Sequence, residues 1–101
     1  MQSVKIGGFN VAIVVTEPGK HLDESRFGTY NPREMKISID GACCQQRRQE
    51  VLLHEILEVI ADQTHTSLAE PGIDHDTLSR IATALYQVFR DNNMAAIMKQ
   101  V

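Results

Sequence analysis

Residues 52–60 read Leu-Leu-His-Glu-Ile-Leu-Glu-Val-Ile, and the spacing of their apolar side chains decides what this part of the chain can form. Apolar residues recur every three or four positions, which is the period of one face of an α-helix. The pattern predicts a helix over residues 44–64 with one side buried. That buried side is expected to consist of Leu53, Ile56, Leu57 and Ile60, with Leu52 and Val59 on its flank.

A second helix is predicted over residues 74–91. Asp74 is well placed to cap its first N–H groups, and Asp76 suits the positive end of the helix dipole. Residues 92–101 are expected to form a short helix or a tail. The second helix also has an apolar stripe, which we expect to be buried against the rest of the protein: Leu78, Ile81, Ala82, Leu85, Val88 and Phe89.

Residues 1–40 have the composition and the alternation of β-strands. Two strands joined by the Gly7-Gly8 turn are expected first, and a strand ending at Asp40 alternates apolar and polar residues as a half-buried strand does. Between them we expect a loop with at most a short strand near residues 27–30. The predicted fold is α+β, with residues 1–101 forming a single domain in which a small N-terminal sheet of three to four short strands packs against two C-terminal helices.

The chain has 101 residues, of which ten are basic and thirteen acidic, for a formal net charge of -3. An acidic balance argues against a nucleic-acid partner held through phosphate contacts. No apolar run is long enough for a membrane helix, and the first residues do not have the pattern of a signal peptide. The adjacent Cys43 and Cys44 cannot build a disulfide framework. We therefore expect a cytoplasmic protein whose partner is neither a membrane nor a nucleic acid.

Between Arg48 and Arg80 the chain has no Lys or Arg, although it has many carboxylates and three of the four histidines. Carboxylate oxygens and imidazole nitrogens without competing cations suit a divalent metal ion. The alternative is a solvated acidic surface, which is the commoner outcome for clusters of charge.

His54 and Glu58 are four residues apart, so they lie one turn apart on the same face of the predicted helix. They can bind one metal ion at the edge of the core. Glu55 is offset by about 100° from His54, which suits a residue that reaches a metal-bound water without binding the metal. This is the geometry of the zinc protease signature His-Glu-x-x-His, with Glu58 in place of the second His. The alternative is an exposed helix face with an ordinary contact between residues four apart.

A catalytic zinc site often uses two His and one Glu, so a second His is required. His65 would lie about 16 Å from His54 along a straight helix, which is beyond reach. His75 starts the second helix and can swing back if the two helices pack antiparallel. The sequence therefore predicts one Zn²⁺ ion held by His54, Glu58 and His75, with Glu55 as the catalytic residue.

With these motifs the chain resembles the small zincin-like metallopeptidases encoded in phages and prophages, which are distant relatives of the ImmA/IrrE type. The resemblance implies a minimal zincin core, in which a small sheet precedes an active-site helix and a following helix gives the third metal ligand. Glu58 stands where the family usually has His, and a later His in some members with this form supports His75. The likeness is carried by residues 36–40, 51–58, 75–88 and 91–92.

The leading hypothesis is a zinc-dependent metallopeptidase with a protein or peptide substrate, in which Glu55 moves a proton from water to the leaving amine. The alternative is a non-catalytic metal-binding or protein-interaction module on the zincin scaffold, with residues 94–98 as a contact. Tyr30 or Tyr86 could stabilise an oxyanion, and the spacing does not choose between them. A helix-turn-helix DNA binder is disfavoured because the connection between the helices is long and the second helix has few cations.

Overall fold

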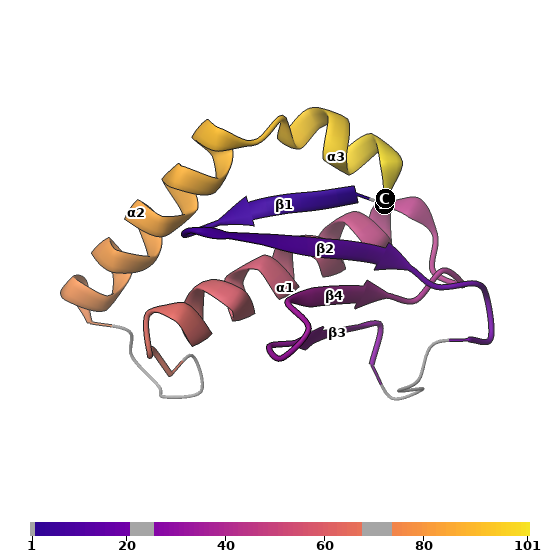
Figure 1. The fold of residues 1–101 in the computed structure, drawn as a ribbon, viewed down its shortest axis with the longest axis horizontal. Coiled ribbons are helices and arrows are strands. Elements are labelled where there is room, and N and C mark those ends of the chain that lie inside the picture. Colours follow the sequence, from indigo (N-terminus) through magenta and orange to yellow (C-terminus); the bar gives the residue numbers. More distant parts are fainter. Residues whose placement is uncertain (1, 21–25, 68–73) are drawn as a thin grey trace.

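The computed structural model describes residues 2–20, 26–67 and 74–101, which form a four-stranded sheet followed by three helices (Figure 1). In chain order, the strands are β1 (Gln2–Ile6), β2 (Phe9–Val15), β3 (Gly28–Asn31) and β4 (Lys36–Ile39). The helices are α1 (Gln45–Gln63), α2 (His75–Asp91) and α3 (Met94–Gln100). The α+β fold predicted from the sequence is confirmed.

The sheet is mixed and has the strand order β1-β2-β4-β3. β1 and β2 form an antiparallel hairpin closed by Gly7 and Gly8, and Gly7 adopts the positive φ of 64° that a two-residue hairpin turn favours. β4 runs parallel to β2 and antiparallel to β3, so β1 and β3 are the edge strands. Alternate side chains along three of the strands point into the core: Val4, Ile6, Val11, Ile13, Ile37 and Ile39.

α1 covers the buried face of the sheet and packs against β1, β3 and β4. Leu52 and Val59, which were expected on the flank of the buried stripe, are fully buried. Leu53, which was expected within the stripe, is 37% exposed, so that part of the prediction is wrong. The helix is rotated about its axis relative to the prediction, and this rotation buries Glu55, which the predicted stripe of Leu53, Ile56, Leu57 and Ile60 left on the opposite side of the helix.

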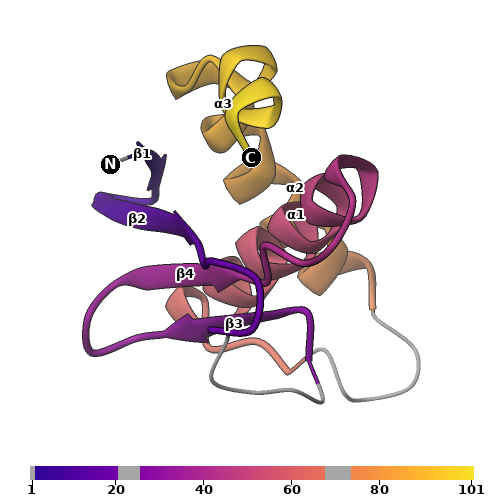
Figure 2. The same cartoon turned by 90° about the vertical axis from the view of Figure 1, so that its right-hand side faces the viewer.

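α2 lies outside this layer, where it packs against β1 and α1 (Figure 2). Val88 is the one residue of α2 that is fully buried, whereas Leu78 and Phe89 are 56% and 51% exposed. The expectation that the whole apolar stripe of this helix is buried is therefore wrong. The reason is that α1 already fills the buried face of a small sheet, so α2 packs only at the edge of this layer, against β1 and α1.

Polar side chains near the end of α2 hold it to the edge of the sheet. The backbone N–H of Lys5 donates to Asn92 Oδ1 at 2.8 Å, and the backbone N–H of Gly7 donates to Gln87 Oε1 at 2.8 Å. The carbonyl of Lys5 accepts from both Asn92 and Gln87. These bonds satisfy backbone groups that an open edge strand would leave unpaired.

α3 returns the chain to the start of α1, where Met94, Ile97 and Val101 join the core. The side chain of Gln49 donates to the carbonyl of Met98 at 2.9 Å, which fixes α3 against α1. Among the described residues, no helix is both long and apolar enough to cross a membrane.

Replacing Asn92 tests the attachment of α2 to the sheet. Asn92→Ala removes two hydrogen bonds to Lys5 and should lower the free energy of unfolding by about 1–2 kcal/mol, measured by urea denaturation. Asn10→Ala is the control at an exposed position of β2, and it should change stability by less than about 0.5 kcal/mol. Equal losses in the two variants would contradict this role of Asn92.

Candidate functional site

The structure brings His54 and Glu58 together on the outer surface of α1. His54 Nε2 lies 3.7 Å from Glu58 Oε1, and both side chains are about half exposed or more. The two groups share one face because they are a single turn apart in a regular helix. Their closeness is what the sequence predicted for two ligands of one metal ion, whereas their exposed position differs from the predicted one at the edge of the core.

Glu55, on the next position of the same helix turn, has a different environment. It is 7% exposed, and it is the one charged side chain that is buried among residues 2–20, 26–67 and 74–101. Within the same ranges its carboxyl group has no hydrogen bond or ion pair. Burial raises the pKa of Glu55 above its usual value and the nearby Glu58 adds to this, while the charges of His54 and Arg26 act in the opposite direction.

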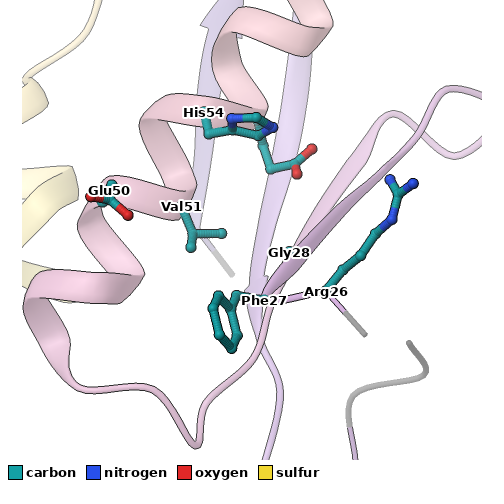
Figure 3. Close-up of a pocket in the computed structure, with 7 residues that line it drawn as sticks. Arg26, Phe27, Gly28, Glu50, Val51 and His54 are labelled. Atoms are coloured by element: carbon teal, nitrogen blue, oxygen red, sulfur yellow. The ribbon is translucent and has the colours of Figure 1, made fainter. Parts of the chain in front are cut away.

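A pocket of about 420 Å³ lies between α1 and the chain that enters β3. Figure 3 shows His54 on the α1 side of this pocket and Arg26 and Phe27 on the other side. Its walls are partly apolar, through Val51 and Phe27, and partly charged. We call it the Glu55 pocket, and its lining residues are Arg26, Phe27, Gly28, Glu50, Val51, His54 and Glu55.

Gly28 sets the distance between β3 and α1 at the Glu55 pocket. A Cβ at this position would lie 2.4 Å from Val51 Cγ1 and 3.4 Å from Glu55 Cγ, so a larger residue would displace the Val51 side chain or push the strand away from the helix. The absence of a side chain therefore lets β3 cover Glu55 and exclude water from one side of it.

His75 does not join the other two predicted ligands. It is exposed at the first residue of α2, beyond the C-terminal end of α1 (Figure 1). Throughout the part of the chain that the structure describes, no three His, Cys, Asp or Glu side chains are placed to hold one metal ion. The structure thus assembles the pair of His54 and Glu58 beside Glu55, with His75 apart from them.

His65 is not at the end of a straight helix, as the sequence argument assumed. α1 ends at Gln63, and His65 adopts a positive φ of 53° that turns the chain. It lines a second hollow of about 560 Å³ together with Glu58 and Tyr30. Of the two tyrosines left open by the sequence, Tyr30 is thus the one near Glu58, whereas Tyr86 is 64% exposed on α2.

Sequence reasoning missed the residues on the strand side of the Glu55 pocket. Arg26, Phe27 and Gly28 belong to a polar stretch of sequence, and no periodic pattern connects them with α1. A glycine at the start of a short strand is a signal of close backbone approach, but it does not identify the helix that approaches.

Comparison of the chain with protein-family models, with curated proteins and with solved structures finds no significant match.

Replacing Glu55 tests its burial. Because folding raises the pKa of this carboxyl, its contribution to stability is greatest in acid and is lost as the pH rises through the raised value. Glu55→Gln should therefore be about as stable as the parent near pH 4 and more stable than it near pH 7, measured by urea denaturation at both values.

Glu17→Gln is the matched control, since Glu17 is an exposed carboxylate on a turn. It should show no comparable gain between the two pH values. A Glu55→Gln variant whose stability follows that of the parent at both values would show that Glu55 is solvated.

Proposed function

We propose that the protein is a zinc-dependent hydrolase that cleaves peptide bonds. The observation that carries this proposal is the position of Glu55, a buried carboxyl without a polar partner in the described chain, beside a His–Glu pair and against a pocket. A buried and unpaired carboxyl group destabilises a fold, so its presence at a pocket favours a chemical role.

His54 and Glu58 fit zinc as two of its ligands. Imidazole nitrogen and carboxylate oxygen are both normal zinc ligands, and the two groups are already close together and open to solvent. His75 is our proposed third ligand. Because His75 stands apart from the pair, the first turn of α2 must approach His54 for the set to be completed.

Zinc, when bound, supplies a water molecule of lowered pKa. Glu55 is one residue from His54 and borders the pocket, so with zinc in place its carboxylate would be the group that takes a proton from water and passes it to the nitrogen of the leaving amine. Val51 and Phe27 limit the access of bulk water to this carboxylate. We propose that the substrate is a protein or peptide segment that binds in the Glu55 pocket.

A second candidate function is a non-catalytic module that binds metal or a protein on the same scaffold. The separation of His75 from His54 and Glu58 favours it, since a catalytic zinc usually needs three protein ligands. The two candidates differ at Glu55, because only a hydrolase needs a base at that position.

The setting that we propose is the cytoplasm, in keeping with the resemblance to proteins encoded by phages and prophages. Cys43 and Cys44 are free thiols before the start of α1, which is compatible with a reducing compartment.

Zinc titration of single variants tests the assignment of roles. His54→Ala and Glu58→Gln should each lose at least tenfold in zinc affinity, because each removes a ligand. Glu55→Gln should keep zinc and lose hydrolysis of a casein or peptide substrate, because an amide cannot accept the proton. Glu58→His restores the usual motif and should bind zinc at least as well as the parent.

Asp62→Asn is the control for Glu58→Gln, since it removes an exposed carboxylate from the next turn of α1. It should leave zinc affinity within about twofold. A parent protein that binds no zinc under metal-replete conditions would contradict the proposal, and so would zinc loss in Glu55→Gln with retention in Glu58→Gln.

A further inference from the structure

Phe27 and Val51 form the apolar part of the Glu55 pocket. Phe27 is 52% exposed although it lines this pocket, whereas Val51 is buried and lies directly against the backbone of Gly28. Figure 3 shows Val51 on the α1 side of the pocket and Phe27 on the β3 side. We call Phe27 and Val51 the apolar wall.

Arg47 holds the ring of Phe27 in position. Its guanidinium group lies over the ring, 5.5 Å from the centroid, and it also forms an ion pair with Glu50. A cation over the face of an aromatic ring is attracted to that ring. The ring is therefore supported on one face by a side chain that is itself held in place, while half of its surface stays accessible to a ligand.

The charged side chains of the Glu55 pocket have other tasks. Glu50 is already ion-paired, and His54 lies beside Glu58 as a proposed zinc ligand. Glu55 is the proposed base, and Arg26 acts on it electrostatically from the opposite side of the pocket. The apolar wall is the part of the pocket that remains to contact a side chain of the substrate.

The apolar wall lies close to the proposed metal ligand along α1. Val51 precedes His54 by three residues and Glu55 by four, so all three lie on one side of the helix. The rise from Val51 to His54 along the helix axis is about 4.5 Å, which is close to the roughly 3.4 Å between successive residues of an extended peptide. A peptide whose cleaved bond lies at His54 and Glu55 therefore brings an adjoining residue to the apolar wall.

We propose that the apolar wall binds a large apolar side chain, such as that of leucine, methionine or phenylalanine, next to the peptide bond that is cleaved. This inference rests on the proposed hydrolase function and adds the class of its substrate. The pocket volume of about 420 Å³ lies within the roughly 300–1,000 Å³ of small-ligand sites, so a side chain of this size fits. A polar side chain would lose its hydration there without gaining a hydrogen bond from Phe27 or Val51.

Digestion of a mixed-sequence peptide library by the zinc-loaded protein tests this proposal, with the cleaved bonds read by mass spectrometry. Leucine, methionine and phenylalanine should be enriched about tenfold over asparagine and glutamine at one of the two positions that flank the cleaved bond. Phe27→Ala should remove most of this enrichment and leave zinc affinity unchanged. Circular dichroism should show that the variant is folded.

Phe9→Ala is the matched control, since Phe9 is a phenylalanine of 54% exposure that does not line the Glu55 pocket. It should keep the preference of the parent for apolar residues. Cleavage by the parent without such a preference would overturn the apolar wall and leave the hydrolase proposal standing. An equal loss of preference in Phe9→Ala and Phe27→Ala would also overturn the apolar wall.

Peptide binding to the zinc-free protein separates this proposal from the proposed function. A blocked pentapeptide of four alanines and a central leucine should shift the NMR signals of Phe27, Gly28 and Val51. It should bind about tenfold more tightly than the same peptide with a central asparagine, which has the shape of leucine without its apolar character. Equal binding of the two peptides would overturn the apolar wall. Tighter binding of the leucine peptide by a protein that cleaves nothing when loaded with zinc would overturn the hydrolase proposal alone.

Discussion

Gly28 allows β3 to lie against α1 at a distance that no residue with a Cβ could reach without displacing Val51. This close contact completes the core on the β3 side and covers Glu55. It also forms the wall of the Glu55 pocket that faces the helix. With the strand further away, Glu55 would be a solvated carboxylate and the pocket between α1 and β3 would be lost.

The size of the sheet explains the position of α2. Four short strands offer one buried face, and α1 fills most of it with Leu52, Ile56 and Val59. α2 lies at the edge of this layer, where it packs against α1 and is hydrogen-bonded to β1 through Gln87 and Asn92. The same constraint leaves Leu78 and Phe89 of α2 exposed and keeps His75 apart from the pair on α1.

The sequence predicted the structure well wherever the spacing of residues within a single strand or helix determines it. The alternation of residues 35–40 and the helical spacing around residues 52–60 predict the strands and helices, and the separation of four residues predicts that His54 and Glu58 meet. The sequence predicted the burial of side chains poorly wherever that burial depends on a second element that packs against the first. The burial of Glu55 depends on β3, and the exposure of Leu78 depends on the limited area of the sheet.

His75 illustrates the same limit for the candidate site. Its position at the start of α2 follows from the capping residue Asp74, whose side chain accepts a hydrogen bond from Thr77, and this was predictable. Its distance from His54 depends instead on how two helices are placed around a sheet, and no local pattern determines that placement.

X-ray absorption spectroscopy of the zinc-loaded protein is the most direct test of the claim that the surface of α1 beside Glu55 is a metal centre. The account predicts a first shell of nitrogen and oxygen alone at about 2.0–2.1 Å, with the scattering pattern of imidazole. The imidazole signal should decrease in His54→Ala. A shell of sulfur at about 2.3 Å would place the zinc at Cys43 and Cys44 and would contradict the account.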